Sequence, residues 1–332
     1  MRPLPHRPPS LSRRKLLTAT AVASLSPLAA WAQGAAWPQR PLRLIVPFSA
    51  GGAADTSARA LAQKAGEFLG QPVTIENRTG GNAVVAANAT LSSPKDGYTF
   101  LWDAANQLTN PVLLKDLAFD YRSAFVPITM GVRAPQALVV RQDFPARNLA
   151  EFLAYVRSKP DTVSVGTPPA GAMGHLAVAL LSQRAGVRLV HTPYRGGAEA
   201  ARDVMGGQID AALITTATAR GTLDSGRTRI LAVTSAQRVA AFADIPTIAE
   251  SGLPGYDMDD WFALFAAAGT PQAPMQRLQA AFAQAAKDPG VAERLTAAGF
   301  VPVANGTEEF QGWLAKQRPL LQKLIQDAHI TL

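Results

Sequence analysis

The chain has 332 residues, of which 48% are hydrophobic and 17% charged, and it contains no cysteine. The formal charge is +8, but the first 32 residues hold five basic side chains and no acid, so 27 basic and 24 acidic residues remain, a balance of +3. This composition excludes disulfides and thiolate metal sites, and so small a charge does not favour nucleic acid as a partner. A chain of about 300 residues buries a large core and usually divides into two lobes.

The N-terminus has the features of an export signal. Residues 12–17 (Ser-Arg-Arg-Lys-Leu-Leu) are similar to a twin-arginine signal, an apolar stretch follows, and Ala30-Trp31-Ala32 offers small residues for cleavage before Gln33. We therefore predict a signal peptide at 1–32 and a periplasmic protein. An uncleaved anchor is the lesser alternative, because the stretch is short for a span of about 20 apolar residues. Export by the general secretory route also stays open, since ordinary leaders can contain an arginine pair.

Short β-type runs then alternate with helical patterns, which predicts an α/β fold. In the first part we expect strands at 42–48, 73–76 and 98–102 and helices at 56–69 and 83–91, with Asp55 as the N-cap of the first helix. Residues 126–140 are expected to be extended chain that crosses into a second region.

The second region repeats the alternation. We expect helices at 149–157, 175–185 and 198–205, and strands at 163–165, 189–191, 209–214 and 229–234. A strand at 261–267 returns to the first region, followed by helices at 274–287, 290–298 and 308–327, the last kinked or split by Pro319. The βα steps favour largely parallel sheets. Crossings near 140 and 262 give a first lobe of 37–140 plus 262–332 and a second lobe of 141–261.

Two segments repeat one layout at the end of a strand. Residues 44–55 and 189–200 each contain an apolar run, a turn with a glycine pair, and a helix start. The N–H groups of a first helical turn have no intrahelical partner, and the helix dipole favours negative charge there. Glycine pairs are commonly only turns, but two such turns from different parts of the chain could enclose one anionic ligand.

Nine motifs in a fixed order connect the chain with one family. They are Trp-Pro at 37–38 with Pro-Leu-Arg-Leu-Ile-Val-Pro-Phe at 41–48, Gly51-Gly52 and Asp55; Gly-Gln-Pro-Val at 70–73 with Glu-Asn-Arg at 76–78; Asp-Gly-Tyr-Thr at 96–99; His-Thr-Pro-Tyr-Arg-Gly at 191–196; Gly-Gly-Gln-Ile-Asp at 206–210; Leu-Ala-Val-Thr-Ser at 231–235; Pro-Thr at 246–247; Gly-Leu-Pro-Gly-Tyr at 252–256; and Ala-Gly-Thr-Pro at 268–271. In these motifs, which span nearly all of the chain after the leader, the protein resembles the Bug family, the periplasmic receptors of tripartite tricarboxylate transporters.

The resemblance implies a two-lobed, Venus-flytrap binding protein in which each lobe is a mainly parallel sheet flanked by helices. Such a receptor captures a small carboxylate (a di- or tricarboxylate, an aromatic acid or a related molecule) and delivers it to membrane permease subunits. Family members hold the ligand largely through backbone amides and ordered water. We expect a monomer with no cofactor, no metal, no nucleic acid partner and no catalytic activity.

The resemblance also implies a set of ligand-binding residues. On the first lobe these are Phe48, Ser49, Ala50 and Gly51, with Asp55 bracing the loop; on the second lobe they are Gly166, Thr167 and His175 of one loop and Thr192, Tyr194, Arg195 and Gly196 of the next. Some have plain structural alternatives: Arg195 could be a solvated surface arginine, and His175 a structural or capping group.

Two departures from the family pattern bear on the ligand. Ile214-Thr215-Thr216 stands where relatives often carry Asp followed by Ser, and residues 102–106 replace a Gly/Ser-rich stretch and introduce Asp103. We count Thr215 and Asp103 as further ligand contacts. We hypothesise that losing one acidic group and gaining Asp103 shifts ligand choice away from amino acids with an ammonium at the usual place. A binding screen in which aspartate binds best would contradict this.

Other functions have less support. The chain has no Gly-x-Ser-x-Gly elbow and no Walker or Gly-x-Gly-x-x-Gly loop, and none of its histidines has metal-ligand spacing. A hydrolase that pairs Ser164 or Ser235 with His175 is the least favoured alternative. A sensor, in which the same clamp reports to a signalling partner, stays open. Neighbouring genes for permease subunits or for a two-component kinase would separate the two.

Overall fold

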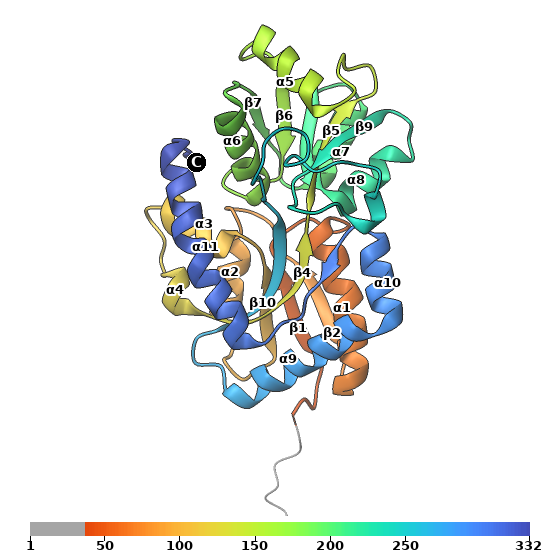
Figure 1. The fold of residues 1–332 in the computed structure, drawn as a ribbon. Helices are drawn as coiled ribbons and strands as arrows, with labels where there is room; N and C mark the ends of the chain where they lie inside the picture. Colours follow the sequence, from red (N-terminus) through yellow and green to blue (C-terminus); the bar gives the residue numbers. More distant parts are fainter. Residues whose placement is uncertain (1–36) are drawn as a thin grey trace, which may run out of the picture. The chain divides into compact units, whose positions relative to one another are not determined.

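The computed structural model describes residues 37–332, so the predicted signal peptide lies outside the described residues. Two β-sheets, each flanked by helices, organise the chain from residue 40 onward (Figure 1). This confirms the two-lobed α/β fold expected from the sequence.

The first lobe is built on a six-stranded sheet in the order β11-β4-β10-β3-β1-β2. Its strands are β1 (Leu42–Val46), β2 (Val73–Asn77), β3 (Thr99–Asp103), β4 (Phe125–Ala134), β10 (Asp260–Ala267) and β11 (Val301–Pro302). Its helices are α1 (Ala53–Leu69), α2 (Val84–Leu91), α3 (Asn106–Leu113), α4 (Tyr121–Ala124), α9 (Gln272–Lys287), α10 (Pro289–Ala297) and α11 (Thr307–Asp327).

The second lobe is built on a five-stranded sheet in the order β7-β6-β8-β5-β9. Its strands are β5 (Gln136–Arg141), β6 (Ser164–Thr167), β7 (Val190–Pro193), β8 (Ala211–Thr215) and β9 (Thr228–Val233). Its helices are α5 (Leu149–Ser158), α6 (Met173–Ala185), α7 (Gly197–Met205) and α8 (Thr216–Leu223), with a short 3₁₀ turn at Ala240–Phe242.

Both sheets are mixed, whereas the sequence suggested mainly parallel ones. The βα units give parallel pairs, β1 with β2 and β3, and β6 with β7 and β8. Strand β10 pairs antiparallel with both β3 and β4, and β5 pairs antiparallel with β8 and β9. The reason is that β4 leaves the first sheet and β10 returns to it, so these two connecting strands run in opposite directions.

The chain changes sheets at Pro135 rather than near residue 140. Strand β4 ends at Ala134 in the first sheet, and β5 begins at Gln136 in the second. The sequence analysis took 126–140 as one extended run, but a proline lacks the N–H that a central strand needs and so interrupts the ladder. The return to the first sheet, at Asp260, lies close to the expected position.

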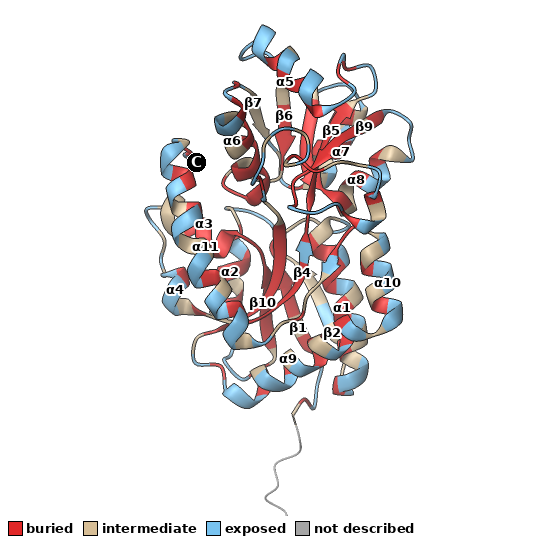
Figure 2. Cartoon of the chain, in the orientation of Figure 1, coloured by how far each residue is buried: buried red, intermediate tan, exposed pale blue. Residues whose placement is uncertain are grey.

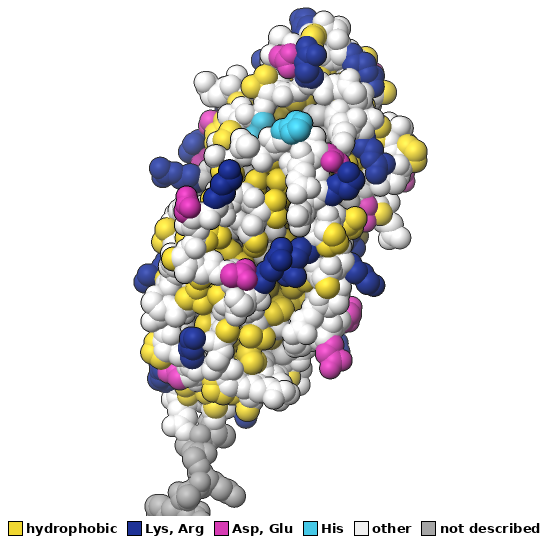
Figure 3. Space-filling model, turned by 90° about the vertical axis from the view of Figure 1, so that its left-hand side faces the viewer, with side chains coloured by type: hydrophobic (Ala, Val, Ile, Leu, Met, Phe, Trp, Pro, Cys, Tyr) yellow, Lys and Arg dark blue, Asp and Glu magenta, His cyan; other side chains and the backbone are white. Residues whose placement is uncertain are grey.

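The strands between the helices form the core. All eight residues of β10 are buried, and Figure 2 shows the strands of both sheets as mostly buried while the outer faces of the helices are exposed. On the face drawn in Figure 3, Lys and Arg side chains are dispersed, with Asp and Glu among them. None of the described helices is both long and apolar enough to cross a membrane.

Three expectations for helices need correction. Helix α1 begins at Ala53 with Gly52 as its N-cap, so Asp55 is its third residue and not the cap. Of the kink or split expected at Pro319, the split does not occur, because α11 is continuous from Thr307 to Asp327, with buried residues on both sides of the proline, Leu314 and Leu321 among them. Helices α3, α4 and α8 were not predicted, since all three are short and polar in sequence and owe their stability to packing.

Gly131 in β4 offers a test of packing in the first lobe. A Cβ at this position would collide with the ring of Trp102 and lie 2.9 Å from Leu61 Cδ1, and both neighbours are fully buried. We expect Gly131→Ala to lower the free energy of unfolding by about 1–3 kcal/mol, the usual cost of overpacking. Chemical denaturation measures this. Gly312→Ala in α11, where no atom lies within 4 Å of the added carbon, is the matched control, and equal losses in the two variants would contradict the packing.

Candidate functional site

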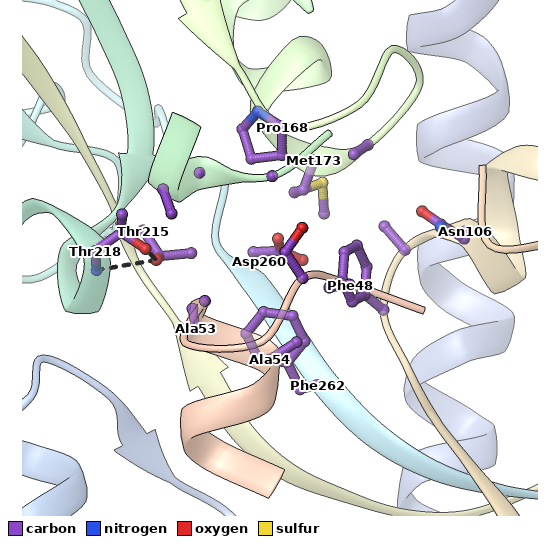
Figure 4. Close-up of a pocket in the computed structure, with 18 of the residues that line it drawn as sticks. Phe48, Ala53, Ala54, Asn106, Pro168, Met173, Thr215, Thr218, Asp260 and Phe262 are labelled. Carbon is purple, nitrogen blue, oxygen red and sulfur yellow. Dashed lines mark hydrogen bonds between the residues drawn. The ribbon is translucent and has the colours of Figure 1, made fainter. Parts of the chain in front are cut away.

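A cavity of about 40 Å³ lies between the two sheets, where the loops that follow their strands meet (Figure 4). The first lobe lines it with Phe48, Ser49, Gly52, Ala53, Ala54, Ala104, Ala105, Asn106, Asp260 and Phe262. The second lobe lines it with Pro168, Ala172, Met173, Gly196, Gly197, Ala198, Glu199, Thr215 and Thr218. This volume is below the about 300–1,000 Å³ of typical small-molecule sites, so the lobes lie close together around the cavity in this structure.

Five helices point their N-termini at this cavity. The N-cap residues of α1, α3, α6, α7 and α8 all line it; they are Gly52, Ala105, Ala172, Gly196 and Thr215. Four of the five caps make no side-chain hydrogen bond to the helix, and only Thr215 does, accepting from the N–H of Thr218. No Lys, Arg or His is among the described residues of the lining. The groups in this lining that favour negative charge are therefore main-chain N–H groups and helix dipoles.

Asp55 braces the first of these helix starts from behind the cavity wall. Its carboxylate accepts hydrogen bonds from the N–H of Gly51 at 3.0 Å, from Arg59 Nε at 2.8 Å and from Asn77 Nδ2 at 2.9 Å. Asn77 Nδ2 also donates to the carbonyl oxygen of Phe48 at 3.0 Å. Burial alone would raise the pKa of Asp55, but these hydrogen bonds outweigh it and hold the pKa below its usual value. The network fixes the 48–52 turn in place.

The residues expected from the sequence fall into three groups. Phe48, Ser49, Gly196 and Thr215 line the cavity. Tyr194 and Arg195 line an adjacent groove of about 590 Å³, which shares Phe48 and Asn106 with the cavity. The remaining residues lie outside both linings; they are Ala50, Gly51, Asp55, Asp103, Gly166, Thr167, His175 and Thr192.

Two stacked histidines, His175 and His191, form hydrogen bonds with the end of β6 and the loop that follows it. The rings of His175 and His191 stack with centroids 3.7 Å apart, His191 Nε2 lies 2.7 Å from Thr167 Oγ1, and His175 Nδ1 accepts from the N–H of Gly171 at 3.2 Å. Burial lowers the pKa of His175, and burial together with the nearby His175 lowers that of His191 to about 4. These side chains position the loop whose Pro168 faces the cavity.

Gly166 owes its identity to packing. A Cβ there would lie 2.5 Å from Ile209 Cδ1 and 2.9 Å from the ring of Tyr194. Thr192 pairs with it in the neighbouring strand β7. Both residues support the wall rather than forming its surface.

Asp103 does not face the cavity. Its side chain is fully buried, with Oδ1 accepting from the N–H of Ala104 at 2.9 Å and Oδ2 from Gln107 Nε2 at 2.8 Å. Burial raises the pKa of Asp103 to about 7. The carboxylate thus holds the start of α3, and the premise that it adds an acidic group to the ligand site does not hold.

Two acidic residues that the sequence analysis did not single out do line the cavity, Glu199 and Asp260. Asp260 is 6% exposed and accepts the N–H of Trp261 on Oδ1 at 2.8 Å. Burial raises the pKa of Asp260 to about 7 against the effect of this hydrogen bond, and the nearby Asp259 and Asp103 act in the same direction as burial. The only sequence signal for these two residues was their position. Asp260 stands at the start of the strand that returns to the first lobe, and Glu199 in the first turn of α7.

The lobes touch across the cavity and at the point where the chain crosses. Ser49 Oγ lies 3.5 Å from Glu199 Oε1, and Asn82 Nδ2 donates to the carbonyl oxygen of Ala170 at 3.1 Å. Near the crossing, Thr216 Oγ1 donates to the carbonyl oxygen of Gly299 at 2.7 Å. The cavity is therefore enclosed by contacts from both sheets.

Comparison with known proteins identifies the family. The model for the tripartite tricarboxylate transporter family receptor matches residues 57–330. The chain belongs to this receptor family. A curated relative, the UPF0065 protein in the tcbD-tcbE intergenic region of Pseudomonas sp. strain P51, is 32% identical over 317 residues, covering 95% of this chain and 94% of its own.

Solved structures agree with this assignment. The periplasmic binding protein BugD is 32% identical with a TM-score of 0.83, covering 89% of this chain and 99% of its own. The Rhodopseudomonas palustris protein Rpa4515, solved with adipate, is 30% identical with a TM-score of 0.86 over 89% of this chain and 99% of its own. MatC from the same organism, solved with bound malate, is 28% identical with a TM-score of 0.80 over 87% of this chain and all of its own.

These relatives are solute-binding proteins and not enzymes, which confirms the prediction of a binding protein over a hydrolase. The family and its structural neighbours are periplasmic binding proteins, which implies a location outside the cytoplasm.

Proposed function

We propose that this protein captures a small carboxylate in the cavity between its lobes and delivers it to the permease subunits of a tripartite transporter. The observation that carries the proposal is the convergence of uncapped helix N-termini from both lobes on one enclosed space. Such termini supply N–H donors and a favourable potential for a carboxylate. Two relatives of the same fold were solved with the carboxylates adipate and malate, which supports the same ligand class here.

The lining suggests how the ligand lies. Phe48, Phe262 and Met173 give the cavity an apolar wall suited to a carbon chain or ring. Arg195 lies in the adjacent groove, where a second carboxylate could reach its guanidinium. In this arrangement one carboxylate is bound by main-chain N–H groups in the cavity and another, where the ligand has one, faces the groove.

The predicted residues that lie outside the cavity position the loops that form it. In our proposal Asp55 fixes the first turn, and Thr167, His175 and Thr192 hold the second-lobe loops in register. Residues 1–32 direct export, by the twin-arginine route, and the rest of the chain works in the periplasm as a monomer. Lobe closure is the step that the bound acid favours, because it contacts both lobes only in the closed state.

A binding screen tests the proposal. The purified protein is mixed with succinate, malate, adipate, citrate, benzoate and terephthalate, and with uncharged diols and diamides of matching length. We expect at least one acid to raise the melting temperature, since ligand at a hundred times its Kd adds about 2.7 kcal/mol of stability, while its uncharged counterpart has no effect. Failure of every acid, or turnover of one, would overturn the proposal. Delivery to a permease is tested by uptake of the binding acid in cells with and without the receptor gene, and unchanged uptake would contradict it.

A further inference from the structure

The cavity that attracts anions also contains two carboxylates, one from each lobe. Glu199 comes from the first turn of α7 in the second lobe, and Asp260 from the start of β10 in the first. A plain anion would be attracted by the helix N-termini and repelled by these side chains. A ligand that suits both the helix N-termini and the two carboxylates must therefore carry more than a negative charge.

Glu199 has a buried oxygen without a partner. Its Oε1 lies 3.5 Å from Ser49 Oγ, at the limit of a hydrogen bond, and its Oε2 is buried with no hydrogen-bond partner among the described residues. A glutamate three residues after an N-cap often bonds back to the N–H of the cap, here Gly196, but that bond is not formed in the described part of the chain. A buried carboxylate oxygen left unpaired is costly, so a donor is expected to meet it.

Asp260 brings a second carboxylate to the same cavity. Its side chain is 94% buried, since 6% is exposed, and its one hydrogen bond among the described residues uses Oδ1. The side chain lines the cavity together with Phe48 and Met173, which are labelled near it in Figure 4. Oδ2 is therefore free to accept from a bound molecule.

We propose that the ligand of this receptor is an acid that also carries a hydrogen-bond donor, a hydroxyl or an ammonium group, which Glu199 and Asp260 accept while the helix N-termini bind its carboxylate. The inference rests on the proposed function and narrows its ligand class. It replaces the hypothesis drawn from Asp103, because the acidic groups that reach the ligand come from α7 and β10. Hydroxy acids and amino acids are then preferred over plain di- and monocarboxylates.

Matched ligand series test this directly by titration calorimetry. Each series keeps one carbon frame and changes one substituent: succinate, malate and aspartate; adipate, 2-hydroxyadipate and 2-aminoadipate; benzoate, 4-hydroxybenzoate and 4-aminomethylbenzoate. In the series that binds best, we expect a donor-bearing member to bind at least about tenfold tighter than the plain acid, the effect of one hydrogen bond to a charged group. A ratio near one, or a preference for the plain acid, would overturn the inference and leave the proposed function intact.

Substitutions at Glu199 and Asp260 test whether these two side chains cause the preference for donor-bearing ligands. Glu199→Gln and Asp260→Asn keep shape and remove charge, and we expect each to reduce the preference for the donor-bearing ligand by about threefold or more, with the plain acid binding as well as before or better. A larger loss for the ammonium member than for the hydroxyl member identifies an ion pair, and equal losses identify a neutral hydrogen bond.

Asp224→Asn, at an exposed position at the end of α8, is the matched control and should leave the ratios unchanged. If the affinity ratio of donor-bearing ligand to plain acid stays at the parent value in both Glu199→Gln and Asp260→Asn, these side chains do not accept the donor. If no member of any series binds, this inference fails; if citrate and terephthalate do not bind either, the proposed function fails with it.

Discussion

Replacing Gly196 with valine is expected to abolish ligand binding while leaving the fold intact. Gly196 has an extended backbone, φ −168° and ψ 171°, which any residue can adopt, so the substitution adds no backbone strain. The added Cβ would lie 3.1 Å from Glu199 Oε2 in the second lobe and 3.7 Å from Ser49 Oγ in the first, where these two side chains meet. The branched side chain would therefore occupy the point where the two lobes approach, and would hold them apart.

We expect a loss of affinity on the order of a hundredfold or more for the best-binding acid of the screen, which corresponds to about 2.7 kcal/mol. Titration calorimetry measures the loss, and thermal unfolding without ligand checks the fold. Gly221→Val is the matched control, because Gly221 lies in α8 of the same lobe with no atom within 4 Å of an added carbon. Normal affinity of the Gly196 variant would rule out closure at this position.

Proline substitutions at the first residues of α1 and α7 are expected to weaken binding by removing main-chain donors. Ala53 and Gly197 are the first residues of these helices and line the cavity. Proline is well tolerated at a first helical position, where its missing N–H costs no intrahelical bond. Gly52 and Gly196, which precede the two sites, are extended, as a residue before proline must be.

A hydrogen bond to a charged group contributes about 1.5–3 kcal/mol, so Ala53→Pro and Gly197→Pro should each weaken binding by roughly 10- to 100-fold. The double variant should lose more than either single one. Ala53→Val and Gly197→Ala add bulk but keep the N–H, and we expect them to bind within a few-fold of the parent. If the proline and control variants lose affinity equally, bulk and not the donor is responsible.

Much of the framework was accessible from the sequence because it depends on local patterns. The glycine pairs at 51–52 and 196–197 end up at the starts of α1 and α7, and the caps of both helices line the same cavity. Turn residues, strand runs and helical periodicity are properties of neighbouring residues. They therefore predicted the alternation of elements and the two glycine turns that meet at the cavity.

The acidic residues of the cavity could not be found in this way. Glu199 and Asp260 lie 61 positions apart in the printed sequence and meet only because β10 returns to the first sheet after the second lobe is complete. No local signal reports such a meeting. The prediction for Asp103 failed for a related reason. The strand was expected at 98–102 and β3 is Thr99–Asp103, but the direction of the Asp103 side chain depends on α3, which was not predicted.

The polar start of α3 illustrates the same limit. Asn106, Gln107 and Asn110 are buried, although their sequence has the character of a loop. Their side chains bond to partners far along the chain or within the helix, as Asn110 Nδ2 does to the carbonyl oxygen of Asn82 at 2.7 Å. Tertiary hydrogen bonds override weak helix propensity here.

The most direct measurement is a crystal structure of the protein with the tightest-binding acid of the screen. We expect a carboxylate oxygen within hydrogen-bond distance of N–H groups at the starts of α1 and α7 at once, in the space lined by Phe48 and Phe262. A complex in which the acid rests only on the Arg195 side chain in the outer groove, with the inner cavity unused, would contradict the account.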